Sequence, residues 1–386
     1  MLRKSVILEI GNRKPECNPA INGPISDFRF LITDFHLKPI KVALSFFQNH
    51  SLQPYNTFGI EANADFFCRV TAGGQLAEAL RFARESGLSP FVLGGGSNIL
   101  LLGDLPYLVM KMELKGIQVI QEDADQVRLR VGAGVVWHDL VAFAVSQGWG
   151  GLENLSLIPG SVGAAPIQNI GAYGVEIKDV FYALEAVRVE DGQTRIFSRD
   201  ECRFGYRDSI FKQEEKNKWV ISSVDFNLSK AGIVHIDYGD VRKVLAEMGA
   251  GQPGIADVSR AIIQIRRSKL PDPAETGNAG SFFKNPEIPA TVFETLKSKF
   301  PAVPGYPQAG DMVKVPAGWL IETAGWKGYR EGRVGVHDRQ ALVLVNLGGA
   351  GGGEVKALAS KIQASVEERF GIRLQPEVNY IGGGLS

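Results

Sequence analysis

Residues 151–174, GLENLSLIPGSVGAAPIQNIGAYG, constrain the fold of this chain more than any other segment. Glu153 is their only formal charge, and glycine recurs at positions 151, 160, 163, 171 and 174. Glycine lets the backbone adopt positive φ angles and approach a ligand closely. The polar side chains of the segment include Ser161, Gln168, Asn169 and Tyr173. Small apolar residues with a few directional polar groups suit a flat heteroaromatic cofactor, although buried turns and bulges are the simpler alternative.

The length of 386 residues exceeds that of a typical single hydrophobic core, so we expect two or three domains. Lys plus Arg equals Asp plus Glu, at 42 each, so no global basic field attracts nucleic acid or an anionic membrane. The cysteines at positions 17, 68 and 202 have neither disulfide nor metal-ligand spacing, and no segment reaches the length of a transmembrane helix. We therefore expect a cytoplasmic protein that binds no metal, nucleic acid or membrane, while local anion sites are still allowed.

Apolar periodicity indicates both helices and strands along the chain. Helical spacing predicts helices over residues 75–85, 137–147 and 354–370. Apolar runs or alternation predict strands over residues 91–93, 127–131, 184–189, 219–228 and 378–381. The middle of the chain should therefore hold a mixed or antiparallel sheet. We interpret residues 1 to about 45 as an appended arm, residues 266–273 as a domain boundary and residues 348–353 as a flexible loop.

A second glycine-rich turn, Gly94-Gly95-Gly96-Ser97-Asn98, follows the strand predicted at residues 91–93. Successive free backbone N–H groups in such a turn form a concave site for phosphate oxygens, and the last two side chains can add donors. The turn has the spacing of neither the dinucleotide fingerprint nor the Walker loop, so by itself it is a weak indication of an anion site.

Four further segments are polar and unusual in combination: CRFGYRDSIFK (202–212), DYGD (237–240), GNAGSFFKNP (277–286) and QPEVNYIG (375–382). Single residues in them have ordinary explanations. Arg207 is of a type that usually forms a surface ion pair, Ser281 is typical of a turn, and Glu377 near a C-terminal strand is typically solvated. Their joint occurrence favours a functional site.

These segments, with NTFGI (56–60), LGGGSNIL (93–100), GLENLSLIPG (151–160) and AGWLIETAGWKG (317–328), resemble the UDP-N-acetylenolpyruvoylglucosamine reductases, the MurB family of peptidoglycan synthesis. The resemblance extends from about residue 48 to about residue 382, with the motifs in the same order. It implies an α+β chain with a vanillyl-alcohol-oxidase-like (PCMH-type) fold that binds FAD non-covalently. The implied parts are an N-terminal extension (1–47), a two-subdomain FAD-binding region (48–266) joined by the C-terminal strand (373–386), and a substrate-binding domain (267–372).

The resemblance also implies roles for individual residues. The flavin pyrophosphate would lie on residues 94–98, and the flavin ring would be lined by Ser161, Gly163, Ala164, Gln168, Asn169 and Tyr173. Arg207 would meet the substrate carboxylate, Glu377 would help polarise or protonate the site, and Ser281 would supply a proton. Contacts to the substrate would come from Tyr238, Lys269 and Asn285, with the tyrosine in a loop that closes over it.

The implied partners of this chain, which we expect to be a monomer, are NADPH and UDP-N-acetylglucosamine enolpyruvate. The enolpyruvyl group would be reduced to give UDP-N-acetylmuramate. NADPH would reduce the flavin and leave before the substrate enters the same cleft, which predicts ping-pong kinetics. The chain departs from the family pattern at Ala164 and Ala165, where relatives often carry serine, and at Gln375, which replaces a frequent glutamate. Residues 1–45 have no counterpart.

Three other functions compete with this interpretation. An alcohol oxidase on the same fold would often tether its flavin through histidine, and His138 is the only histidine near a glycine loop. A non-catalytic nucleotide-binding protein would have no need of Arg207, Ser281 and Glu377 together. A Rossmann dehydrogenase is disfavoured because no G-x-G-x-x-G opens a helix with an acidic residue about 20 positions later.

Overall fold

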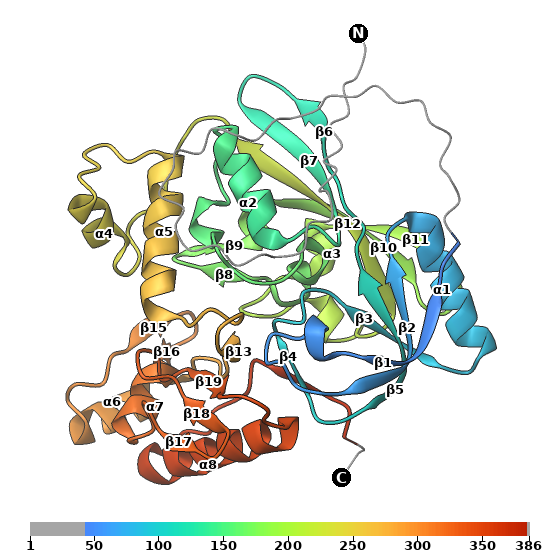
Figure 1. Cartoon of the computed structure of the whole chain (residues 1–386). Coiled ribbons are helices and arrows are strands. Elements are labelled where there is room, and N and C mark those ends of the chain that lie inside the picture. The colour runs from blue at the N-terminus through green and yellow to red at the C-terminus, as the bar shows by residue number, and fades with distance from the viewer. Residues whose placement is uncertain (1–42, 384–386) are drawn as a thin grey trace.

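The computed structural model describes residues 43–383, and Figure 1 shows their sheets and helices. The first sheet is mixed and has the order β1-β2-β5-β3. Its strands are β1 (Phe46–Ser51), β2 (Asn63–Val70), β5 (Leu105–Met112) and β3 (Ser89–Leu93). Helix α1 (Gly73–Glu85) connects β2 to β3 and buries one apolar face that includes Leu76 and Leu80. The helix predicted at 75–85 and the strand predicted at 91–93 are therefore confirmed.

The second sheet is antiparallel, with the order β11-β10-β12-β7-β6. Its strands are β6 (Ile117–Glu122), β7 (Gln126–Gly132), β10 (Phe181–Arg188), β11 (Thr194–Ser198) and β12 (Trp219–Ser229). Two helices accompany it, α2 (Trp137–Ser146) and the short α3 (Arg199–Cys202). The buried Trp137 indole N–H donates to the Leu155 carbonyl at 3.0 Å, which fixes the start of α2 against the glycine-rich segment. These elements confirm the predicted helix and strands of the middle region.

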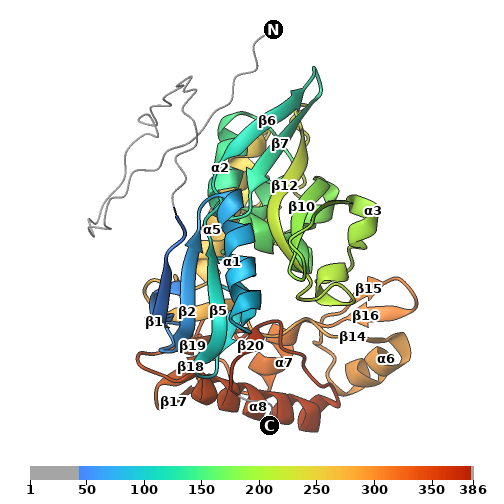
Figure 2. The ribbon, with the colours of Figure 1, turned by 90° about the vertical axis from the view of Figure 1, so that its right-hand side faces the viewer.

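Helix α1 packs between the first and second sheets (Figure 2). One apolar cluster joins Leu76 of α1, Met110 of β5 and Val220 of β12. Arg84 near the end of α1 donates to the Val189 carbonyl at 2.9 Å. Burial of this shared cluster holds the two sheets together as one unit.

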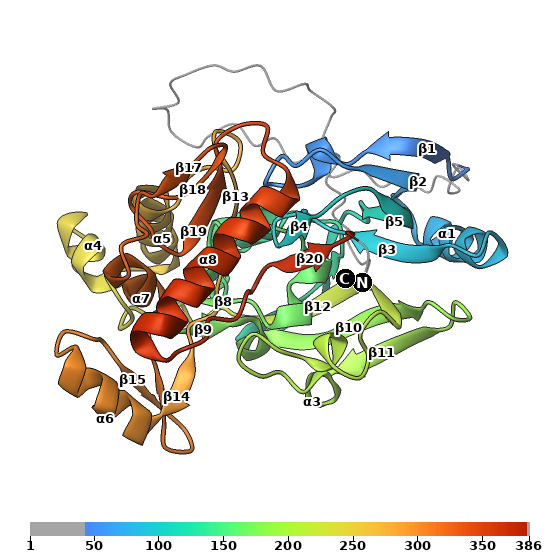
Figure 3. The ribbon, with the colours of Figure 1, turned by 90° about the horizontal axis from the view of Figure 1, so that it is seen from below.

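The third sheet is antiparallel and lies C-terminal in the chain, with the order β13-β19-β18-β17. Its strands are β13 (Gly277–Ser281), β17 (Arg330–Glu331), β18 (Val334–Val336) and β19 (Val343–Asn346). A smaller sheet contains β14 (Glu287–Pro289), β16 (Met312–Lys314) and β15 (Tyr306–Gln308). The helices of this part are α6 (Ala290–Lys299), α7 (Ala317–Thr323) and the long α8 (Gly352–Phe370), which crosses the lower face in Figure 3.

The predicted loop at 348–353 is wrong at its end, because α8 begins at Gly352. A Cβ at Gly352 would lie 1.8 Å from the Leu101 carbonyl oxygen, so only glycine permits this approach of the helix to β4 (Ile99–Leu101). The strand predicted at 378–381 is confirmed as β20 (Asn379–Ile381). It pairs in parallel with β4 and returns the chain to the first sheet's side of the molecule (Figure 3).

Two boundaries differ from the expected division of the chain. β1 begins at Phe46 and pairs with β2, so residues 46 and 47 belong to the first sheet. The rest of the expected arm, residues 1–42, lies outside the described residues. The division between 266 and 267 falls inside α5 (Ile255–Lys269), which packs with α4 (Val241–Glu247) in a small cluster of its own.

Candidate active site

The glycine turn at 94–98 connects β3 to β4 and is pressed against two other loops. A Cβ at Gly95 would lie 2.7 Å from the Gly160 Cα, and Gly94 is equally close to the Ser161 hydroxyl, at 2.6 Å. Gly96 has φ +64°, and its Cβ would come within 1.9 Å of the Tyr55 carbonyl oxygen. A side chain at any of these three glycines would therefore clash with the neighbouring loops. An anion-binding turn likewise needs its backbone N–H groups uncovered by side chains.

We predict that Gly96→Ala destabilises the protein by roughly 2–5 kcal/mol, because it adds left-handed strain to a backbone clash. Retention of the bound flavin should fall with it. The melting temperature of the apo-protein and the flavin content after gel filtration measure the two effects. Gly103→Ala is the matched control, since a Cβ at Gly103 meets nothing within 4 Å. Equal melting temperatures and equal flavin contents in the two variants would contradict the requirement for glycine at position 96.

The other predicted flavin contacts fall into two groups. Asn98 Nδ2 donates to Gln168 Oε1 at 2.9 Å, and Ala164 is exposed, so these residues face accessible space beside the turn. Gly163 instead packs on Ala133, which a Cβ would approach to 2.5 Å. The buried Asn169 side chain donates to the Gly205 carbonyl and to Glu176 and accepts from the Lys178 N–H. Its amide is therefore occupied within the protein, in the turn before the hairpin of β8 (Gly171–Ala172) and β9 (Val175–Glu176).

Arg207 and Glu377 form an ion pair across the interior of the molecule, with Arg207 Nε 3.1 Å from Glu377 Oε1. The side chains are only 21% and 15% exposed, so water screens the pair less than a surface pair. Arg207 has φ +54° and its Nη2 donates to the Gly171 carbonyl at 2.7 Å. A left-handed arginine is unusual and marks a position where the surrounding fold imposes the conformation.

Backbone pairing brings Ser281 beside this ion pair. The Glu377 N–H donates to the Phe282 carbonyl at 2.8 Å, and the Lys284 N–H donates to the Gln375 carbonyl at 2.9 Å. Ser281 is the last residue of β13, one position before this contact, and its side chain is exposed. Arg207 and Glu377 are therefore in direct contact, and the backbone of Glu377 is hydrogen-bonded to the residue that follows Ser281.

The predicted substrate residues come from α5, the loop before α4 and the segment after β13. Tyr238 is 58% exposed and lies over Gly174, whose Cβ would sit 3.4 Å from the tyrosine Cβ. Lys269, the last residue of α5, pairs with Asp240 at 2.6 Å. Asn285 Oδ1 accepts the Ala317 N–H at 2.9 Å, so this oxygen fixes the start of α7.

Sequence reasoning missed Arg266, which lies one helical turn before Lys269 on α5. Burial lowers the pKa of its guanidinium, and its Nε is buried with no hydrogen-bond partner. It contacts the Tyr173 phenol, and burial raises the pKa of that phenol while the positive charges of Arg266 and Lys269 oppose the rise. The helical phase of α5 could have revealed this arginine, because it follows the buried Ile262 by four residues.

Two more cations near the ion pair were also missed. Lys212 Nζ donates to the Arg207 carbonyl at 3.1 Å, and burial lowers its pKa, with a further contribution from repulsion by Lys284. Lys314 lies 3.6 Å from the centroid of the Tyr206 ring. Lys314 is itself paired with Glu287 at 3.1 Å. With Arg207 and Arg266, the four cations still outnumber the paired carboxylates Glu377 and Glu287, so the site is suited to bind an anion.

Other chemistries find little support around this site. His138 Nδ1 accepts the Leu157 N–H at 3.0 Å, so that nitrogen is already engaged and is a poor point of attachment for a flavin. Between residues 43 and 383, no group of three or more His, Cys, Asp or Glu side chains could hold a metal ion. Over the same range, no helix combines the length and apolar character needed to cross a membrane.

Comparison with known proteins identifies two matching families. Residues 64–198 match the FAD binding domain, and residues 272–381 match the C-terminal domain of UDP-N-acetylenolpyruvoylglucosamine reductase. The fold is also similar to the crystal structure of MurB from Thermus caldophilus, with a TM-score of 0.59 and 24% identity, covering 88% of this chain and 99% of that one. The domain match, the fold and the cationic site define an FAD-dependent oxidoreductase of the PCMH-type fold.

Two relatives specify the family. The UDP-N-acetylenolpyruvoylglucosamine reductase of Pseudomonas aeruginosa is 54% identical over 333 residues, covering 86% of this chain and 98% of its own length. The reductase of Chromobacterium violaceum is 48% identical over 337 residues, covering 87% and 99%. The chain belongs to the UDP-N-acetylenolpyruvoylglucosamine reductase family.

Proposed function

We propose that this enzyme uses NADPH to reduce the enolpyruvyl group of UDP-N-acetylglucosamine enolpyruvate, giving UDP-N-acetylmuramate for peptidoglycan synthesis in the cytoplasm. The observation that supports the proposal is the largely buried ion pair of Arg207 and Glu377, with the Glu377 N–H bonded to the carbonyl of the residue after Ser281. An enolpyruvyl group combines a carboxylate with an adjacent carbon–carbon double bond. Its reduction therefore needs a cation for the carboxylate and a proton donor near the double bond.

The residues present fit an FAD cofactor. A Cβ at any of the three glycines 94–96 would meet neighbouring atoms within 3 Å, and the buried Arg266 Nε, which has no hydrogen-bond partner, could donate to a polar group of the cofactor. In the proposed site, residues 94–98 would hold the pyrophosphate, while Ser161, Ala164, Gln168 and Tyr173 would line the ring. When bound and reduced, FAD supplies a hydride to the terminal carbon of the double bond.

Arg207 would stabilise the charge that develops on the substrate carboxylate as hydride arrives. The guanidinium is held by Glu377 and the Gly171 carbonyl, so its orientation is set before the substrate binds. A charge-assisted bond from a pre-oriented donor strengthens as the carboxylate gains charge, and this lowers the barrier to the reaction. Glu377 would hold the planar guanidinium group of Arg207 in this orientation, and its negative charge would help to polarise the Ser281 hydroxyl.

Ser281 would donate its hydroxyl proton to the second carbon of the former double bond. The hydroxyl is a weak acid in water, but a strongly basic carbon held at hydrogen-bond distance needs little acidity from its donor. The hydride and the proton then add to the two carbons of the double bond and give a lactyl ether, and the exposed Ser281 alkoxide regains its proton from water.

The nucleotide diphosphate would lie near Tyr238 and Lys269, with Asn285 as a further contact. Asn285 Oδ1 is occupied by Ala317, so a contact from this residue would use its Nδ2 donors. The exposed Tyr238 would close over the diphosphate, whereas Lys269 would exchange Asp240 for phosphate oxygens.

We predict that Tyr238→Ala raises the KM for the UDP-sugar roughly tenfold or more, because a buried tyrosine contact is lost from the closed complex. The KM for NADPH should change little. Steady-state kinetics with each substrate varied in turn measures both values. The exposed Tyr182, which stacks on Arg128, supplies the control variant Tyr182→Ala. A parallel rise in both KM values would count against a contact specific to the UDP-sugar.

The overall proposal is tested by initial rates of NADPH oxidation at several concentrations of both substrates. One cleft that admits the two substrates in turn predicts parallel lines in double-reciprocal plots. Turnover that depends on the UDP-sugar establishes the reductase. Oxidation of NADPH by oxygen alone, with no response to the UDP-sugar, would reject the proposed substrate.

A further inference from the structure

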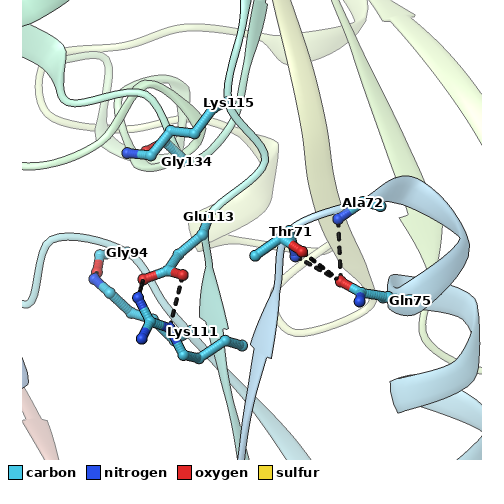
Figure 4. A network of polar contacts seen from close by, with 9 residues as sticks. Thr71, Ala72, Gln75, Gly94, Lys111, Glu113, Lys115 and Gly134 are labelled. Atoms are coloured by element: carbon cyan, nitrogen blue, oxygen red, sulfur yellow. Dashed lines mark hydrogen bonds and ion pairs between the residues drawn. The ribbon is translucent and has the colours of Figure 1, made fainter. Parts of the chain in front are cut away.

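Lys111 is the one charged residue in β5, and it lies where the first sheet meets the glycine turn. It is paired with Leu93, the residue that immediately precedes the turn. Its ammonium group donates to the Gly94 carbonyl (Figure 4). The positive charge of this side chain is therefore at the entrance to the proposed pyrophosphate cradle.

Within the described chain, Lys111 has no ion-pair partner. Glu113, two residues further along the same strand direction, is already held by Arg69 through two hydrogen bonds of 2.8 and 3.0 Å. Lys111 is partly buried, and this burial is the main cause of the lowered pKa of its ammonium group. A partly buried cation without a counter-ion is unfavourable unless an anion binds next to it.

The neighbourhood of Lys111 is also the junction of the two sheets. Lys115, in the segment after β5, donates to the Gly134 carbonyl at 2.5 Å (Figure 4). A Cβ at Gly134 would lie 2.5 Å from the Glu113 Cα, and Gly95 is similarly close to Gly160. The loops of both sheets therefore meet next to the end of β5 that carries Lys111, as they would beside a cofactor bound between the sheets.

We propose that Lys111 supplies the formal positive charge that binds the diphosphate of FAD. This inference rests on the proposed cofactor site at residues 94–98, none of which carries a charge. Backbone N–H groups give a diphosphate directional donors, but they cannot neutralise it. An ammonium has three donors, so Lys111 can keep the Gly94 carbonyl and still bind phosphate oxygens.

The test is FAD titration of the apo-protein, followed by flavin fluorescence at two salt concentrations. Lys111→Gln keeps a donor for Gly94 but removes the charge, so we expect FAD to bind about 10- to 100-fold more weakly, with a smaller salt dependence. Lys111→Arg should stay within a few-fold of the natural protein. Lys115→Gln is the matched control, since Lys115 has a similar carbonyl contact but is exposed. Riboflavin, which lacks phosphate, should bind equally well to all four proteins.

Three results would overturn this inference. Unchanged FAD affinity and salt dependence in Lys111→Gln would show that the charge is not used. Equal weakening of FAD and riboflavin, together with a lower melting temperature of the apo-protein, would make Lys111 a structural support for Gly94. Failure of the natural apo-protein to bind FAD at all would reject the cofactor site itself, an outcome distinct from the other two.

Discussion

Ser281→Ala should leave reduction of the flavin by NADPH almost intact and slow its reoxidation by the UDP-sugar about 10²- to 10⁴-fold, the usual contribution of a positioned acid. Ser281 touches neither Arg207 nor Glu377 through a hydrogen bond present in the structure, so the ion pair should survive the change. Stopped-flow absorbance of the flavin separates the two half-reactions. The defect should therefore lie in the second half-reaction alone.

The natural control for Ser281→Ala is Ser360→Ala, since the Ser360 hydroxyl only contacts the Lys356 carbonyl of its own helix, at 3.0 Å. Both half-reactions of this control should match those of the natural enzyme. If Ser281→Ala slows reduction and reoxidation equally, the hydroxyl supports the cofactor or the fold, and it is not the proton donor.

Glu377→Gln should lower the rate of the UDP-sugar half-reaction about 10²- to 10³-fold, comparable with the loss of one pre-oriented transition-state contact. Glutamine has nearly the same shape and can still accept from Arg207 Nε. Glutamine lacks the negative charge that holds the Arg207 guanidinium group, so this group would no longer be fixed in the orientation that the substrate carboxylate needs.

Single-turnover reoxidation of NADPH-reduced protein measures this effect directly. Glu322→Gln is the control, because Glu322 forms an exposed ion pair with Lys327 at 2.9 Å and such pairs contribute little. Substrate reoxidation in Glu377→Gln at the natural rate would show that Arg207 does not depend on Glu377. A large loss of thermal stability in Glu377→Gln would instead assign the pair a role in folding.

The helices and strands that could be predicted from the sequence are those with regularly spaced apolar residues. Leu76, Leu80 and Ala83 have the helical period of α1, and Val127, Leu129 and Val131 alternate as β7 requires. Strands of two or three residues, such as β14 to β18, are too short to show any period. The close approach of Gly352 to β4 depends on a tertiary contact, so the start of α8 was placed too late.

The candidate site was predictable by residue type and by resemblance, but its geometry was not. The segment that contains Ser281 lies beside Glu377 because backbone hydrogen bonds join two segments that are distant in sequence, and local patterns carry no signal for such pairing. Asn169 and Asn285 were expected beside ligands, yet their side chains make internal hydrogen bonds. Arg266 was missed because a helical arginine is normally exposed.

The most direct test of the central claim is anaerobic reoxidation of the enzyme after reduction by one equivalent of NADPH. On adding UDP-N-acetylglucosamine enolpyruvate, the absorbance of oxidised flavin should return and UDP-N-acetylmuramate should form in equal amount. UDP-N-acetylglucosamine, which lacks the double bond, should leave the flavin reduced. A flavin that NADPH reduces but the enolpyruvyl compound cannot reoxidise would contradict the account and assign the site to another reaction on this fold.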